Sequence, residues 1–214
     1  MDYEAAREQM VEEQLRARGI VDRRVLAAFR SVPRHLFVNT ELRHEAYADH
    51  PLPIGGGQTI SQPYIVGLMT SLLRLQGHER VLEIGAGSGY QTAILSDLAL
   101  EVFSVERLPE LLSGVDERLR QMGCLNVHLS AGNGSLGWPE HAPYDAILVS
   151  AAAPDLPEPL VEQLGEGGRL VLPIGPQQGQ LLVEVEKRGG KLIRRNVANC
   201  LFVPLIGQQG WPTT

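Results

Sequence analysis

The stretch that most constrains the fold runs from Arg80 to Tyr90 and reads RVLEIGAGSGY. Its apolar beginning is typical of a buried parallel strand, and the glycines that follow predict a tight turn into a helix that begins near Tyr90. Glycine tolerates backbone angles that other residues avoid, and it lets a ligand approach the main chain. The first N–H groups of the helix have no partner inside it, so they are free to face a ligand. The sequence therefore predicts a nucleotide-cofactor turn in an α/β fold.

The spacing of the glycines separates two kinds of cofactor turn. A dinucleotide turn reads G-x-G-x-x-G and points its amides at a pyrophosphate. Here Gly85, Gly87 and Gly89 alternate, and Glu83 precedes them with a carboxylate that suits the ammonium group of an amino acid better than a phosphate. The pattern resembles motif I of the class I S-adenosylmethionine (SAM) methyltransferases, and this resemblance implies SAM as the cofactor. The alternative is a glycine-rich connection between strand and helix that binds nothing.

A second carboxylate supports the cofactor interpretation. The segment 101–106 alternates like a strand and ends on Glu106, about twenty residues past the glycine turn, where nucleotide-binding folds place a ribose-binding acid. We therefore expect Glu106 to bind the two ribose hydroxyls. The alternative is that Glu106 caps the next helix, which begins near Pro109. The two roles are compatible.

Residues beyond 79 predict a doubly wound, mostly parallel sheet of the Rossmann-like methyltransferase class. The strands are expected near 80–84, 101–106, 126–130, 145–149 and 168–173, and the helices between them near 90–99, 109–122 and 157–164. The end of the chain changes character, because Gly189-Gly190 separates two further strands as a hairpin would, at 180–187 and 191–198. With another strand at 200–206, the sheet is expected to finish with an antiparallel edge.

The first part of the chain predicts helices and one structured loop. Helices are expected at 4–18, 22–31 and 63–75, while residues 47–61 hold too much glycine and proline for a helix and are too apolar for a bare linker. With no repeat or linker, the chain is expected to be a single domain of residues 1–214. Within it, residues 1–78 supply the N-terminal helices and the substrate loop, and residues 79–214 supply the cofactor-binding sheet.

Composition restricts the partners and the compartment. A net charge of −6 without a basic stripe argues against a nucleic acid bound through its phosphates. Cys124 and Cys200 lack disulfide-framework or metal-ligand spacing, so no metal is expected and the cysteines are read as reduced thiols. No segment resembles a leader or a membrane span. We therefore expect a cytoplasmic protein without a membrane partner, and most simply a monomer.

The motifs together resemble one family, the protein-L-isoaspartate (D-aspartate) O-methyltransferases. Besides motif I, the resemblance rests on the loop LPIGGGQTISQP, on YDAILVSAAAP and LGEGGRLVLPIG, and on FVPL, at residues 52–63, 144–154, 164–175 and 202–205. The T-I-S-Q-P part of the loop is the specific feature, because motif I alone indicates only a methyltransferase. The resemblance covers nearly the whole chain.

The resemblance implies a role for individual residues. Ser61 corresponds to the active-site serine of the family. Substrate-binding residues are expected to be Ile54, Thr59, Ile60, Val203 and Pro204, and SAM-binding residues to be Glu83, Gly85, Gly87, Gly89, Glu106, Asn133 and Gly134. One position departs from the family, which usually has Gly-Asp-Gly where this chain has Gly132-Asn133-Gly134. The family aspartate accepts a hydrogen bond from the adenine amino group, and because the Asn133 carbonyl can do so only without charge, weaker cofactor binding is expected.

The implied reaction is methyl transfer from SAM to the free carboxylate of L-isoaspartyl residues in damaged proteins and peptides. That carboxylate has a reference pKa near 3.5 and is ionised at pH 7. No general base is then needed, which agrees with the lack of a recognisable catalytic histidine. The resemblance further implies that the methyl ester collapses to a succinimide and so begins repair. Two alternatives stay open, a SAM-dependent methyltransferase of another substrate and a SAM-binding protein with reduced turnover.

Overall fold

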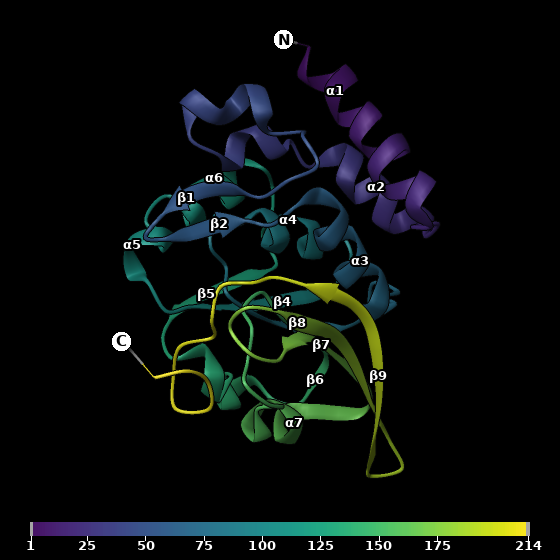
Figure 1. Ribbon diagram of the computed structural model, residues 1–214, viewed down its shortest axis with the longest axis vertical. Coiled ribbons are helices and arrows are strands. Elements are labelled where there is room, and N and C mark those ends of the chain that lie inside the picture. Colours follow the sequence, from purple (N-terminus) through teal and green to yellow (C-terminus); the bar gives the residue numbers. More distant parts are fainter. Residues whose placement is uncertain (1, 213–214) are drawn as a thin grey trace.

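A seven-stranded sheet forms the centre of the molecule in the computed structural model, which describes residues 2–212 (Figure 1). The strand order is β5-β4-β3-β6-β7-β8-β9, in which β3 to β7 run parallel and β8 and β9 are antiparallel. The strands are β3 (Arg80–Ile84), β4 (Glu101–Glu106), β5 (Val127–Ala131), β6 (Tyr144–Val149), β7 (Leu164–Ile174), β8 (Gln180–Arg188) and β9 (Lys191–Cys200). The predicted α/β class, the parallel sheet and the antiparallel edge are confirmed.

The central strands are apolar on both faces because helices cover both faces of the sheet. On β3, Val81 belongs to one buried cluster and Leu82 to the other, so successive side chains enter opposite cores. The helices are α1 (Tyr3–Gln9), α2 (Arg23–Ser31), α3 (Pro63–Leu73), α4 (Tyr90–Ser96), α5 (Pro109–Leu112), α6 (Val115–Gln121) and α7 (Glu158–Gln163). Buried side chains of α2, α3, α4 and α6 pack into the first core, while α7 packs into the second.

The structure corrects two sequence expectations, at 109–122 and 200–206, and adds detail to the loop expected at 47–61. The helix expected at 109–122 is two helices, because Gly114 adopts a left-handed φ of 84° between them. The segment 200–206 is not a strand, and its Pro204 forms only an isolated bridge to Ala152, since proline has no N–H for a strand ladder. The loop at 47–61 contains a short hairpin, β1 (Leu52–Gly55) and β2 (Gln58–Ile60).

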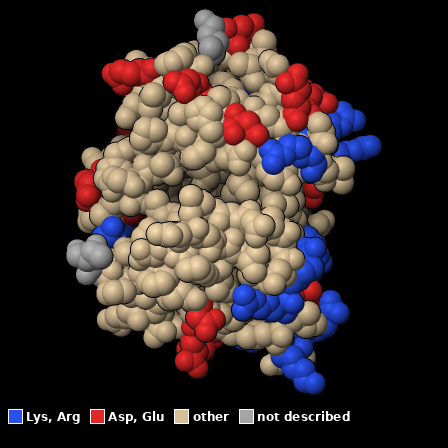
Figure 2. All heavy atoms as spheres, viewed as in Figure 1, with Lys and Arg blue, Asp and Glu red and all other residues tan. Residues whose placement is uncertain are grey.

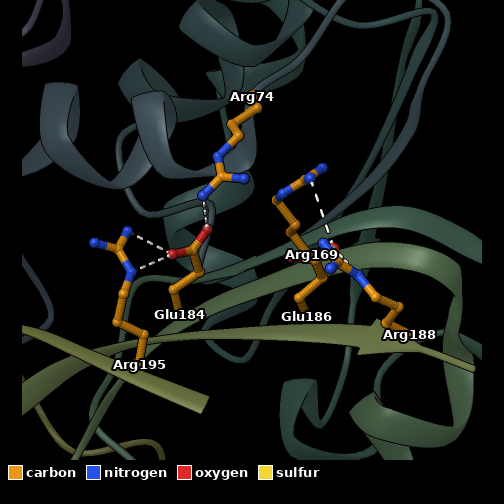
Figure 3. A network of polar contacts seen from close by, with 6 residues as sticks. All are labelled: Arg74, Arg169, Glu184, Glu186, Arg188 and Arg195. Atoms are coloured by element: carbon orange, nitrogen blue, oxygen red, sulfur yellow. Dashed lines mark hydrogen bonds and ion pairs between the residues drawn. The ribbon is translucent and has the colours of Figure 1, made fainter. Parts of the chain in front are cut away.

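An ion-pair network fixes helix α3 to the antiparallel edge of the sheet (Figure 3). Glu184 on β8 accepts from Arg195 of β9 and from Arg74, whose Nη2 lies 3.0 Å from Glu184 Oε1. A neighbouring group joins Glu186 to Arg188 and Arg169. Arg74 is the C-cap of α3 with a left-handed φ of 54°, and its side chain points to Glu184 (Figure 3). Because α3 starts just after Ser61, the network anchors the helix that continues the predicted substrate loop.

Candidate functional site

One cavity lies at the carboxyl ends of β3, β4 and β6, beneath the β1–β2 hairpin. About 910 Å³ of empty space, which includes open solvent at the mouth, lies within it. On the face drawn in Figure 2, the middle is largely free of charged side chains and is hollowed. Parallel sheets present ligand sites at this end of their strands, so the location agrees with the cofactor turn predicted from the sequence.

The structure brings most of the predicted site residues to this cavity. The predicted residues that line it are Thr59, Ile60, Ser61, Gly85, Gly87, Glu106, Gly134, Val203 and Pro204. Ile54, Glu83, Gly89 and Asn133 lie outside its lining. Ser150, which the sequence places at the carboxyl end of its strand, also lines the cavity. The sequence did not indicate several further lining residues, among them Gln58, Met69, Tyr90, Gln91, Arg107, Leu205 and Ile206.

The glycine turn needs glycine for two physical reasons. The φ angles of Gly85, Gly87 and Gly89 are 94°, 52° and 86°, all in the left-handed region that other residues avoid. Added side chains would also meet close neighbours, since a Cβ on Gly89 would stand 2.8 Å from Val115 Cγ1 and one on Gly87 3.3 Å from Ile54 Cδ1. The turn therefore brings bare backbone to the cavity at Gly85 and Gly87, while Gly89 packs behind it as the N-cap of α4.

Glu106 lines the cavity and also binds the backbone that precedes α5, although that helix has no side-chain cap. Its Oε2 accepts from the Gly87 N–H at 2.9 Å, and its Oε1 accepts from the Leu108 N–H at 2.9 Å. The carboxylate thus braces the glycine turn and the backbone that leads into α5. It also lines the cavity, and because each carboxylate oxygen has two lone pairs, both oxygens can accept one further hydrogen bond from a ligand.

Glu83 is fully buried beneath the glycine turn rather than in the cavity lining. Its Oε2 accepts from the hydroxyls of Thr92 and Ser104, each at 2.6 Å. Its Oε1 has no hydrogen-bond partner among the described residues. Burial raises the pKa of Glu83 to about 7, and the two hydroxyl donors offset part of that shift. One oxygen of this carboxyl group is therefore left for a partner that residues 2–212 do not supply.

A buried arginine stands behind Ser61. Arg34 is fully buried, and its Nη2 donates to the Ser61 carbonyl at 2.8 Å while its Nε donates to the Ala46 carbonyl at 2.7 Å. Its guanidinium carbon lies 4.9 Å from the centre of the Tyr90 ring, which lines the cavity. Burial lowers the pKa of Arg34 to about 10, so the side chain stays charged at neutral pH.

Sequence reasoning missed Arg34, although a signal for it existed. The residue is a lone arginine in the mostly apolar stretch VPRHLFV, at residues 32–38, where a buried side chain is expected. A charged group in such a stretch is either exposed or held by specific partners. The carbonyl of Ser61 is one of those partners, so Arg34 helps to fix the backbone of the loop that enters the cavity.

Asn133 uses its side-chain oxygen locally. Asn133 Oδ1 accepts from the Ser135 N–H at 3.1 Å and from the Ser135 hydroxyl at 2.8 Å, which caps a short 3₁₀ turn, Gly134–Leu136. Gly134 is the member of this turn that reaches the cavity. Ile54 likewise lies beside the cavity, in a second depression that it shares with Gly87 and Arg118.

The charged side chains in the cavity lining are those of Glu106 and Arg107, and the lining contains no histidine. No group of three or more histidine, cysteine or acidic residues within the described chain is arranged to hold a metal ion. Among residues 2–212, no helix has the length and apolar character needed to cross a membrane. A ligand in the cavity thus meets backbone amides, hydroxyls and apolar walls, with one carboxylate braced by the glycine turn.

Comparison with known proteins connects this cavity to one family. A sequence model of the family described as protein-L-isoaspartate(D-aspartate) O-methyltransferase (PCMT) matches residues 5–210. Two relatives are a protein-L-isoaspartate O-methyltransferase of Methanoculleus marisnigri, 56% identical over 96% of this chain and 93% of the relative, and protein-L-isoaspartate O-methyltransferase 1 of Syntrophobacter fumaroxidans, 54% identical over 99% of each chain.

Solved structures agree with the sequence comparison. A protein-L-isoaspartate O-methyltransferase superposes with a TM-score of 0.86 at 29% identity, over 95% of this chain and 67% of that one. A putative protein-L-isoaspartate O-methyltransferase from Plasmodium falciparum, in complex with S-adenosyl-L-homocysteine, has a TM-score of 0.82 at 28% identity, over 94% of this chain and 98% of that one. The sequence match, the shared fold and the cavity between the glycine turn and the loop at Thr59–Ser61 lead to one conclusion: this chain belongs to the protein-L-isoaspartate(D-aspartate) O-methyltransferase family.

Proposed function

We propose that this chain transfers the methyl group of S-adenosylmethionine to the free carboxylate of L-isoaspartyl residues in damaged proteins and peptides. The observation that carries the proposal is that two segments distant in sequence line one cavity. The predicted substrate loop contributes Thr59, Ile60 and Ser61, and the predicted cofactor turn contributes Gly85 and Gly87. A site that joins a methyl donor to its acceptor needs both ligands side by side.

The cavity fits SAM at the glycine turn. Bare backbone at Gly85 and Gly87 allows close approach, and Glu106 has lone pairs left for the ribose hydroxyls. Glu83 is buried just under the turn and outside the cavity lining, where its negative charge would favour a cationic group above it, such as the ammonium of the amino-acid moiety, without direct contact. When bound, SAM supplies an activated methyl group on a positively charged sulfur.

The remaining residues orient the acceptor. An isoaspartyl carboxylate is already ionised at pH 7, so it attacks without a general base. A lining without histidine is consistent with this requirement. Ser61 is proposed to donate a hydrogen bond to the carboxylate and hold it in line with the methyl group, and apolar walls such as Ile60, Val203 and Pro204 exclude water. Because an anion and a cation react to give neutral groups, alignment in a dry cavity supplies much of the acceleration.

The methyl ester is proposed to collapse to a succinimide without help from the protein, which returns part of the damaged chain to normal aspartate. The monomeric state, the cytoplasmic location, the single-domain organisation and the absence of nucleic-acid and membrane partners stay predictions of the sequence.

The test is methyl transfer from labelled SAM to a matched pair of peptides that differ only in an isoaspartyl or an aspartyl residue. The label should enter the isoaspartyl peptide alone, as an ester released by mild alkali. At saturating SAM, kcat/KM for the peptide should show no activating ionisation between about pH 6 and 8, because the nucleophile is ionised throughout that range. Label that resists alkali, or SAM binding without transfer, would contradict the proposal.

A further inference from the structure

The C-terminal segment folds back over the end of the sheet and closes one side of the cavity. It first lies along the loop after β6, where the Ala152 N–H donates to the Val203 carbonyl and the Leu205 N–H donates to the Ala152 carbonyl, both at 2.8 Å. It then turns back on itself, since the Trp211 N–H donates to the Leu205 carbonyl at 2.7 Å. We refer to residues 205–211 as the C-terminal loop. Leu205 and Ile206 are the part of this loop that lines the cavity.

Two polar side chains outside the cavity hold the C-terminal loop in place. The Gln209 N–H donates to the Ser135 hydroxyl at 3.1 Å, and that hydroxyl donates to Asn133 Oδ1 at 2.8 Å. Ser135 is fully buried, whereas Gln209 is exposed, so the bond between them joins the surface loop to a buried side chain. The loop is therefore joined through Ser135 to the turn that carries Gly134 into the cavity.

Close packing reinforces this attachment. Gly207 has a φ of 153°, and a Cβ at this position would collide with Asn133 Oδ1 and stand 2.5 Å from Ser135 Oγ. The loop backbone thus rests directly on the Asn133–Ser135 pair. A side chain at position 207 would not fit, so this contact requires glycine.

The attachment lies on the cofactor side of the cavity. The turn at Asn133 follows β5, which pairs with β4, and the Gly132 N–H donates to the backbone carbonyl of Glu106 at 2.9 Å. Glu106 is the residue proposed to bind the ribose. The wall that Asn133 and Ser135 support is therefore beside the nucleoside part of the cofactor rather than beside Ser61.

We propose that Asn133 and Ser135 are positioning residues for SAM, which act by holding the C-terminal loop as a wall of the nucleoside subsite and not by touching the cofactor. This inference rests on the proposed function for the identity of the ligand. The inference gives Asn133 a structural role, because its side-chain oxygen accepts hydrogen bonds from both the N–H and the hydroxyl of Ser135. Loss of the hydrogen bond between Asn133 and Ser135 should weaken cofactor binding. It should leave the alignment of the substrate carboxylate by Ser61 unchanged.

The first test compares Ser135→Ala with Ser96→Ala. Ser96 donates to Asn126 Oδ1 at 2.5 Å, so the control removes the same kind of serine-to-asparagine bond away from the cavity lining. Calorimetry with S-adenosylhomocysteine should give a dissociation constant about five- to twentyfold higher for Ser135→Ala, on the scale of one lost hydrogen bond and a loosened wall. The value for Ser96→Ala should stay within twofold of the parent protein. At saturating SAM, kcat and the peptide KM should be unchanged in both variants.

A second measurement uses the unaltered protein and so does not depend on a variant that folds. Hydrogen exchange of the amides of Gly207, Gln209 and Trp211 should slow when S-adenosylhomocysteine binds, because the ligand and the attachment stabilise the same loop. Unchanged exchange in this loop, or an unchanged dissociation constant for folded Ser135→Ala, would overturn the inference. Because both readouts use binding without peptide, they can succeed even where methyl transfer to isoaspartate fails.

Discussion

The two sides of the cavity are each backed by a fully buried charged group, and the two groups are held differently. Glu83, beneath the cofactor side, meets neutral hydroxyls and has a pKa raised to about 7. Arg34, behind the substrate side, donates to two backbone carbonyls and keeps its charge, since its pKa is lowered only to about 10. The cofactor side can thus take up a proton near neutrality, whereas the substrate side is permanently positive.

This difference matches the charges of the ligands proposed for each side. A negative substrate carboxylate arriving at Ser61 meets a cation just behind the loop, and a buried cation of this kind costs free energy that an anionic ligand offsets. A cationic cofactor beside Glu83 favours the ionised carboxylate and should lower its pKa once bound. The cavity therefore favours an anion on one side and a cation on the other before either ligand binds.

The largest expected effect tests the substrate side alone. Ser61→Ala should reduce kcat/KM for an isoaspartyl peptide on the order of a hundredfold, because the carboxylate loses the donor proposed to align it. The affinity for SAM, measured by calorimetry, should stay within a few-fold. A loss of SAM affinity as large as the loss of kcat/KM would show that the two sides are not separate.

The substitution Glu106→Ala tests the cofactor side of the cavity alone. Loss of the carboxylate should weaken SAM binding by about 1.5–3 kcal/mol, the scale of a hydrogen bond to a charged group. The braces to Gly87 and Leu108 disappear with it, so a melting curve must accompany the titration. Unchanged affinity in a folded variant would remove Glu106 from the site.

A pH series on Glu83→Gln tests the proposed role of the buried carboxyl. Its folded pKa of about 7 lies above the ordinary value of 4.5, so the folded protein binds more protons than the unfolded chain between those pH values. The free energy of unfolding therefore falls as pH rises through this window, and glutamine removes that loss. The melting temperature of Glu83→Gln relative to the parent protein should rise by several degrees from pH 5 to pH 8. A flat difference would mean that Glu83 has an ordinary pKa.

The smallest effect is expected from Asn133→Asp. Aspartate keeps an oxygen in the place of Asn133 Oδ1, so the bonds from Ser135 and the support of the C-terminal loop persist. SAM affinity should therefore change by less than about threefold. A tightening of about tenfold would show instead that the side chain reaches the adenine, as the family resemblance implies.

The sequence predicted the parallel sheet closely because buried strands and glycine turns are local patterns. The turn at Gly85–Gly89 and the strand that ends at Glu106 both lie where their residue types predicted. The sequence did not predict the partners of Arg34, or the attachment of Gly207 to Asn133, because each joins segments far apart in the chain. For Glu83 the sequence predicted a functional carboxylate, but no local pattern distinguishes a carboxylate in a cavity from one beneath it.

The network at Glu184 gives the molecule an uneven response to ionic strength. The Glu184 side chain is only 5% exposed, although Arg74 and Arg195 reach it from solvent. Mobile ions screen exposed pairs such as Arg16–Glu12 and Arg30–Glu8 more than a carboxylate removed from water. Rising salt should thus loosen the N-terminal helices before it releases α3 from β8. Because α3 follows the Ser61 loop directly, the substrate side of the cavity should keep its shape at salt concentrations that already loosen the N-terminal helices.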